Sequence, residues 1–181
     1  MEKFLNIPVQ DLVVTGTSTT PSIGVDIKTT GNLFANVSPG DILHQSTDNY
    51  YYEVLTKVDD NNLTLAKLEP SAVIPVVSGK TFFIHSGTAS TGVLVSGVDV
   101  GLVEQLSTST TTIAYDAPTS GNDLITLTHT PIAAGSEVAR DTVQSQIVRA
   151  LQTKWNEPSY NEIGDALISA DDIKVIGIEL T

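Results

Sequence analysis

The chain has 181 residues, of which 40% are hydrophobic and only 17% are charged, whereas about a quarter of the residues in ordinary globular proteins are charged. Its net charge is −12 and its nine Lys and Arg residues are scattered, so nucleic acid and anionic membrane surfaces are disfavoured as partners, since both attract clustered cations. The absence of cysteine excludes disulfides, thiolate metal sites and thiol nucleophiles.

The size and the opening of the chain indicate a small protein that is made in a cytoplasm. A chain of this length holds one domain or two small ones, and small domains hide a smaller share of their surface than large ones do. We therefore expect the protein to contact other copies of the same chain and to form a homo-oligomer. The first eight residues lack the long apolar segment of a signal peptide, and no stretch approaches the ~18 apolar residues of a transmembrane helix.

The low share of charged residues indicates that Thr, Ser, Asn and Gln supply much of the polar surface. Neutral hydroxyl and amide side chains can be buried against another protein at a lower desolvation cost than charged groups. Such a surface suits a subunit with a large area of protein contact.

Short strand candidates alternate with turns between residue 11 and residue 85. Turn-forming residue types at 38–41 and 59–62 separate runs that are rich in β-forming side chains. An apolar run at 4–9 precedes this stretch, whose own strand candidates are residues 12–14, 23–27, 42–45, 50–58, 63–68, 76–77 and 82–84. Because strands of this length joined by tight polar turns make small barrels or sandwiches, we expect a small β-barrel over residues 10–87.

The second half of the chain combines further strands with one helix. After a linker of small residues at 86–92, strand candidates follow at residues 93–95, 98–105, 110–115, 124–128 and 173–180. Before the last strand, apolar side chains recur every three or four residues, which predicts one long helix over residues 136–155, with Ser136 as its N-cap and Pro158 beyond its end. The expected fold is therefore mainly β with one long helix: a small β-barrel module and an α+β module, an antiparallel sheet with one packed helix.

No constellation of residues indicates catalysis or metal binding. Residues 59–62, Asp-Asp-Asn-Asn, could suggest calcium, but the glycine and the glutamate of an EF-hand loop are missing, so a polar hairpin turn is favoured. The chain also lacks a nucleophile elbow, a P-loop and the glycine pattern of dinucleotide-binding proteins. We therefore expect no enzyme activity, no catalytic residue, no cofactor and no metal.

The three histidines lie far apart in strand candidates and lack the spacing of a metal-binding pair. They are His44, His85 and His129. His129 ends an alternating strand, so we expect it on the same side as the neighbouring leucine. Half-buried histidines with satisfied hydrogen bonds are favoured over ligands or general bases.

The candidate protein-contact residues are Tyr50, Tyr51 and Tyr52, because a tyrosine combines apolar area with a hydroxyl group. Strand alternation sends Tyr51 to one face and its two neighbours to the other. The alternative is that these tyrosines fill the barrel core and pack on its outside. The sequence leaves both open, and whichever tyrosines are exposed are the candidates for the contact surface.

Five segments outside the barrel share a pattern with a known class of proteins. They are residues 1–9, 98–105, 110–115, 124–129 and 139–152, which read MEKFLNIPV, VDVGLVEQ, TTTIAY, LITLTH and ARDTVQSQIVRALQ. Together they resemble small virion structural proteins of marine tailed bacteriophages, including cyanophages. The resemblance covers roughly the first nine residues and residue 93 to the end.

The resemblance bears on the organisation of the chain. In shorter proteins of this kind the opening strand runs almost directly into a Leu-Val-Ser strand like that at 94–96, whereas about 80 residues lie between the two here. The resemblance therefore implies that the barrel of residues 10–87 is an insertion, and that residues 1–9 and 93–181 form the α+β module together.

The resemblance also implies a function and a location, as a capsid decoration or cement subunit on the virion surface. Such a subunit clamps neighbouring copies of the major capsid protein, and it needs contact area and repeated contacts rather than chemistry. The turn and strand SPGDI at 38–42 is also similar to the small β-barrels that decorate phage particles.

Two alternatives come from other functional classes. A tyrosine-rich barrel could belong to a tail or fibre component that binds a receptor or a glycan. A carbohydrate-active enzyme would need a pair of carboxylates, and the sequence singles out no such pair. The copy number in the virion separates a lattice subunit from a tail subunit.

Overall fold

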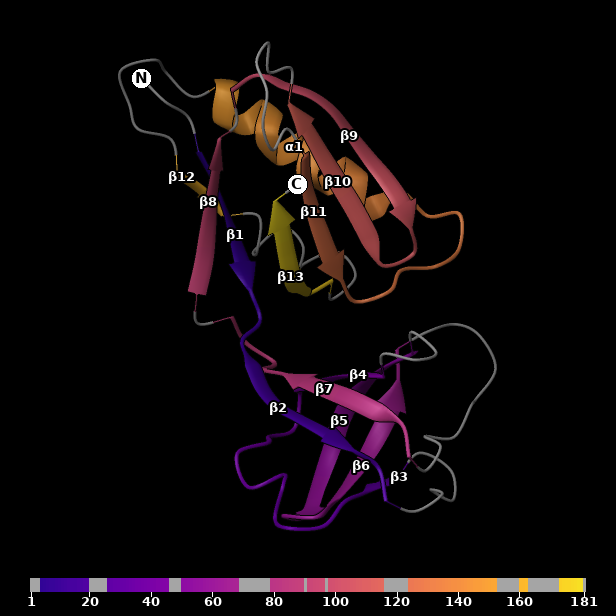
Figure 1. Ribbon diagram of the computed structural model, residues 1–181. Helices are drawn as coiled ribbons and strands as arrows, with labels where there is room; N and C mark the ends of the chain where they lie inside the picture. Colours follow the sequence, from indigo (N-terminus) through magenta and orange to yellow (C-terminus); the bar gives the residue numbers. More distant parts are fainter. Residues whose placement is uncertain are drawn as a thin grey trace. The chain divides into compact units, whose positions relative to one another are not determined.

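The computed structural model describes residues 4–19, 26–45, 50–68, 79–89, 91–96, 98–115, 124–152, 160–162 and 173–180, and in these ranges the chain is mainly β (Figure 1). It divides into two compact units. One unit is formed by Met1–Val9 together with Ser90–Thr181, and the other by Gln10–Ala89. The sequence places this division near residues 9–10 and 87–93. We call the first the helix unit and the second the half-barrel unit.

The half-barrel unit is one curled antiparallel sheet. Its strands are β2 (Leu12–Thr17), β3 (Asp26–Lys28), β4 (Ile42–Gln45), β5 (Tyr50–Asp59), β6 (Asn62–Lys67) and β7 (Thr81–His85), in the order β2-β7-β4-β5-β6-β3. The expected small barrel is observed as a half-barrel. A backbone hydrogen bond of 3.1 Å from Thr19 to the carbonyl of Lys28 links the chain after β2 to the end of β3, the two outermost strands. The strand candidate at 76–77 lies outside the described residues.

Alternation along the strands builds the core of this unit. Leu43 on β4 lies opposite Tyr52 on β5 and Ile84 on β7, and all three side chains are buried. The buried set is Ile27, Phe34, Val37, Leu43, Tyr52, Val54, Leu63, Leu65, Phe82 and Ile84. Most of these residues are β-branched, aromatic or leucine side chains on one face of the sheet, which is why the meander could be recognised in the sequence.

A loop without strand pattern also contributes to the core. Phe34 in this loop is fully buried, and its ring centroid lies 5.9 Å from that of Phe82. The backbone N–H of Phe34 donates to the carbonyl of Asp60 at 2.8 Å, which ties the loop to the turn between β5 and β6. Burying an aromatic side chain of this size contributes about 1.5–3 kcal/mol, so the loop is part of the stable unit.

The turn at 38–41 is held by the buried carboxylate of Asp41. One carboxylate oxygen accepts a hydrogen bond from the N–H of Ser38 at 2.9 Å, and the other accepts one from the N–H of Gly87 at 2.8 Å. Gly40 adopts a φ of 91°, and a Cβ on Gly87 would lie 2.4 Å from the carbonyl oxygen of Gly40. The turn before β4 is thereby fastened to the chain just after β7.

The helix unit packs two sheets and a helix around a shared core. The first sheet has the strand order β12-β1-β8 and consists of β1 (Phe4–Val9), β8 (Thr91–Ser96) and β12 (Tyr160–Glu162). The second sheet has the strand order β13-β11-β10-β9 and consists of β9 (Val100–Ser107), β10 (Thr110–Tyr115), β11 (Leu124–His129) and β13 (Val175–Leu180). The helix is α1 (Val138–Gln152). The core is Ile7, Val95, Val103, Ile113, Ile125, Leu127, Ile132, Ala139, Val143, Ile147, Ile173 and Val175.

The expectation of one long helix over residues 136–155 is wrong, because α1 is a short helix of 15 residues. Ser136 caps its start as predicted, since its hydroxyl accepts the N–H of Val138 at 3.4 Å. The apolar stripe buries Ala139, Val143 and Ile147, but Leu151 is 50% exposed. Because helices in proteins are held mainly by packing of their apolar face, the last turn gains little from tertiary contacts. Pro158 lies outside the described residues.

Strand β12 is not predicted by any pattern in the sequence. It has three residues and pairs in parallel with β1, while β1 pairs along its whole length with β8 in antiparallel register, from Phe4 opposite Ser96 to Val9 opposite Thr91. A parallel pair needs a long crossover connection, and the chain between β1 and β12 includes α1. Three residues are too few to show strand periodicity.

Candidate functional site

The structure places the tyrosine cluster largely inside the half-barrel unit. Tyr51 and Tyr52 are each 1% exposed, and Tyr50 is half-buried. Tyr52 packs in the core, whereas Tyr51 points to the other face and stacks on His44 with ring centroids 4.4 Å apart. The ammonium group of Lys67 lies 5.3 Å from the centroid of the Tyr50 ring. Of the three predicted contact residues, Tyr50 alone keeps appreciable exposed area.

His129 is buried and hydrogen-bonded on both sides of its ring. Its Nδ1 lies 2.8 Å from the carbonyl oxygen of Thr130, and its Nε2 lies 3.1 Å from the hydroxyl of Thr111. This arrangement fits a neutral ring that donates from Nδ1 and accepts at Nε2. Burial lowers the pKa of His129, and the hydrogen bond to Thr130 acts in the opposite direction. A ring held in this way is a structural element of the core.

The other two histidines belong to the half-barrel unit. Burial lowers the pKa of His85, whose Nδ1 lies 3.4 Å from the carbonyl oxygen of Gln10. His44 stacks on Tyr51 and also lies 6.3 Å from the ring of Phe83, so it forms a cross-strand aromatic row.

The acidic turn at 59–62 is a hairpin turn, as predicted. One carboxylate oxygen of Asp59 accepts the backbone N–H of Asn61 at 2.7 Å and the side-chain amide of Asn62 at 2.7 Å. These hydrogen bonds lower the pKa of Asp59. The polar groups of the turn therefore satisfy one another's hydrogen bonds. The described part of the chain holds no group of three His, Asp or Glu side chains that could bind a metal ion.

Two exposed apolar side chains of the half-barrel unit arise from bulges in β5. The register between β5 and β6 shifts once between Val54 and Thr56, and again between Lys57 and Asp59. Leu55 and Val58 are the extra residues, and they are 52% and 65% exposed. A bulge re-aims the side chain that it inserts. We refer to these two exposed residues together as the bulge patch.

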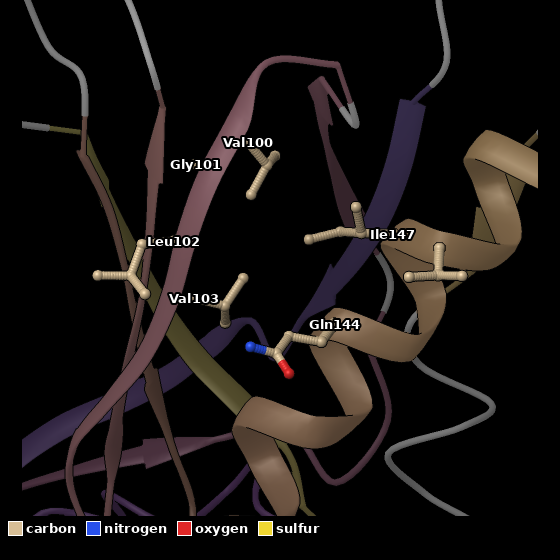
Figure 2. A pocket seen from close by; sticks show the side chains of 7 residues that line it. Val100, Gly101, Leu102, Val103, Gln144 and Ile147 are labelled. Carbon is tan, nitrogen blue, oxygen red and sulfur yellow. The ribbon is translucent and has the colours of Figure 1, made fainter.

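The helix unit exposes a second set of apolar side chains along β9. Leu102 and Leu106 are 56% and 59% exposed, and Val148 on α1 is 48% exposed. The register between β9 and β10 shifts so that Gly101 is unpaired, which places Val100 and Val103 both against the core on the helix side. Leu102 then points to the opposite side of the strand (Figure 2). Leu102 and Leu106 form what we call the β9 patch.

A groove lies between β9 and α1 next to this patch. Its volume is about 260 Å³, and it is lined by Val100, Gly101, Leu102, Val103, Gln144, Ile147 and Val148. Figure 2 shows Val103 and Ile147 on facing walls, with the amide of Gln144 reaching from the helix toward β9. Among the residues that the structure describes, no ionisable side chain lines the groove. The volume of the groove lies below the ~300–1,000 Å³ of typical small-molecule sites. The groove is suited to bind one or two apolar side chains of another polypeptide.

None of the predicted contact residues lines this groove, and the sequence pattern does not single out the residues that do. The available signal is an edge-like strand at 98–105 that carries leucine and valine but no Lys, Arg or Pro. This signal can be recognised only when β9 is known to be the edge strand of its sheet. That position follows from the order of four strands, which the pattern of one strand does not contain.

Comparisons with family models, curated protein sequences and solved structures found no match to this chain. Among the described residues, no helix has the length and apolar character needed to cross a bilayer. The site is therefore defined by its geometry: two apolar patches, one on each compact unit, and a small apolar groove beside one of them.

Proposed function

We propose that this chain is a non-enzymatic virion structural protein, a capsid decoration or cement subunit that binds and stabilises the lattice of the major capsid protein. The observation that carries the proposal is that each compact unit exposes its own apolar patch. The resemblance of residues 1–9 and 93–181 to small virion proteins is the reason for naming the major capsid protein as the partner.

Two patches on separate units suit a repeating partner. When two weak contacts are linked, the second forms at a high effective concentration, so the pair binds about 10²–10⁴ times more tightly than either contact alone. A lattice offers both sites at a fixed spacing, whereas an unassembled capsid subunit offers fewer. The low share of charged residues keeps the desolvation cost of a large contact small.

In this proposal the protein is made in the host cytoplasm and joins the outer surface of the capsid. Copies bound to neighbouring lattice sites also contact one another as a homo-oligomer. A protein that binds the assembled lattice in preference to its dissociated subunits stabilises the lattice by mass action.

The first experiment mixes the purified protein with expanded capsids that lack it, and separately with unassembled major capsid protein. We expect saturable co-sedimentation with the capsids, weaker binding to the unassembled protein, and a higher temperature of capsid disruption when the protein is bound. An absence of binding to expanded capsids would falsify the proposal.

The second experiment measures copy number in separated heads and tails of purified virions by quantitative gel densitometry. A decoration subunit is expected with the heads in hundreds of copies. A few copies with the tails would instead support a tail or fibre component with a receptor- or glycan-binding barrel. The burial of Tyr51 and Tyr52 weakens the original reason for that alternative.

A further inference from the structure

Strand β9 has one edge without a strand partner among the residues that the structure describes. It is the last strand in the order β13-β11-β10-β9. Sheet edges in soluble proteins usually carry Lys, Pro or other features that prevent pairing with another chain. Strand β9 has no Lys, Arg or Pro, and it exposes Leu102 and Leu106 instead. Between its two register shifts, residues 102–105 follow a regular ladder with β10.

The two faces of this edge differ in chemistry. On the helix side lies the apolar groove formed with α1, where Val103 faces Ile147 (Figure 2). On the other side, Leu102 and Glu104 alternate outward along the ladder, and both are exposed, as is Leu106 at the register shift that follows. Glu104 is the one charged residue of β9. A strand added at this edge sends its alternate side chains to these two faces, because successive side chains in a strand point to opposite sides.

The charge of Glu104 argues against a second copy of the chain as the added strand. Antiparallel pairing of two copies centred on this segment brings the two Glu104 side chains close to each other. Like charges directly opposite on neighbouring strands are destabilising, whereas opposite charges are stabilising.

We propose that the edge of β9 accepts an extended segment of the major capsid protein by strand addition. This inference rests on the proposed function and names the partner segment of one of its two patches. The segment has apolar side chains at the positions that enter the groove, and a Lys or Arg on its other face opposite Glu104. Backbone hydrogen bonds provide binding, and the groove and Glu104 provide specificity, as in other cases of β-strand addition.

The test compares substitutions at the two ends of the same sheet. Glu104→Lys and Leu102→Lys alter the β9 edge, and Glu179→Lys and Leu180→Lys are matched controls on β13, where both side chains are also exposed. We expect each β9 variant to weaken binding to expanded capsids about tenfold or more, because like charges across an interface are strongly unfavourable. The β13 variants are expected to bind within about twofold of the unaltered protein.

A cross-linking experiment identifies the occupant. Because the chain has no cysteine, Glu104→Cys allows a photo-activated cross-linker to be attached at that position alone. We expect the cross-linked peptide to come from the major capsid protein and to contain a Lys or Arg among alternating apolar residues. Cross-links to a second copy of this chain, or to another virion protein, would overturn the inference.

The two proposals fail in different ways. If the unaltered protein does not bind expanded capsids, the proposed function fails. If it binds and the Glu104→Lys and Leu102→Lys variants bind equally well, only the inference about β9 fails. Circular dichroism of each variant checks that it folds. Glu104→Gln is a milder substitution, for which we again expect weaker binding to expanded capsids. Unchanged binding of Glu104→Gln would count against the inference.

Discussion

The carboxylate of Asp41 joins two backbone N–H groups that lie in the turn before β4 and just after β7. Replacing it with asparagine in Asp41→Asn leaves one oxygen and puts an amide group against the second N–H. We expect the free energy of unfolding to fall by about 1–3 kcal/mol, the cost of an unsatisfied buried polar group. Urea unfolding measures the change.

A matched control for Asp41 is Asp60→Asn in the same unit. Asp60 forms an exposed ion pair with Lys57, with 2.8 Å between the charged atoms. Exposed pairs contribute about 0–1 kcal/mol, so we expect a small effect. Equal losses for the two variants would show that the Asp41 carboxylate does not hold the turn.

His129 makes stability depend on pH. Because burial lowers its pKa below the ordinary value of 6.5, the folded protein binds fewer protons than the unfolded chain between the two values. Its contribution to stability is complete above the unfolded value and is lost as the pH falls from 6.5 through the lowered pKa. We expect the unfolding free energy to decrease in this window by at most about 1.4 kcal/mol per pH unit for this group.

The measurement for His129 is urea unfolding of the protein and of His129→Gln between pH 7.5 and pH 4.5. The glutamine amide can still donate and accept hydrogen bonds but does not titrate in this range, so the variant is expected to depend less steeply on pH. His85→Gln removes the second histidine with a lowered pKa and is also expected to make the dependence on pH less steep below pH 6.5. Identical pH profiles for the protein and His129→Gln would contradict the assignment.

Helix α1 has one buried and one exposed valine, and these test how the helix is held. Val143 is 1% exposed and Val148 is 48% exposed. Val143→Ala is expected to lower the unfolding free energy by about 2 kcal/mol, because it removes buried methyl groups and leaves a small cavity. Val148→Ala makes the same change in helix propensity at a side chain that is about half exposed, so we expect a change within about 0.5 kcal/mol. Similar losses at both positions would contradict packing as the main source of helix stability.

The strands of the half-barrel unit could be predicted from the sequence, whereas the bulge patch could not. Runs of β-forming residues bounded by turns mark β4, β5, β6 and β7, because their signals lie within each strand. Leu55 and Val58 read as ordinary strand residues. They are exposed because the register between β5 and β6 shifts at each of them, and register depends on two strands at once.

The same limit applies to α1 and to the groove beside it. The helix period predicts Ala139, Val143 and Ile147 as the buried face, but the end of the helix depends on where tertiary contacts run out. The groove joins residues of β9 to residues of α1 that lie about 40 positions further along the chain. Such a juxtaposition follows from the order of strands in the sheet and not from local pattern.

For the whole molecule, two patches on two units predict a bivalent mode of binding. We expect Leu55→Ser with Val58→Ser, or Leu102→Ser with Leu106→Ser, to weaken binding to expanded capsids by a factor on the order of 10²–10⁴. Leu12→Ser in the half-barrel unit and Leu180→Ser in the helix unit are controls, because both side chains are also more than half exposed. Binding that depends on one patch alone would show that the second unit does not contact the lattice.

The paired register of β1 and β8 has a consequence for protein engineering. Val9 and Thr91 already lie opposite each other in an antiparallel pair, although 81 residues separate them in the sequence. A two-residue Asn-Gly turn in place of residues 10–90 would join them as an ordinary β-hairpin. In the half-barrel unit, the backbone carbonyl of Asp11 accepts a hydrogen bond of 2.8 Å from the N–H of Ser86, so this unit begins and ends at adjacent points. We therefore expect that the half-barrel unit can be exchanged for another domain whose termini lie close together, with the helix unit retaining its fold.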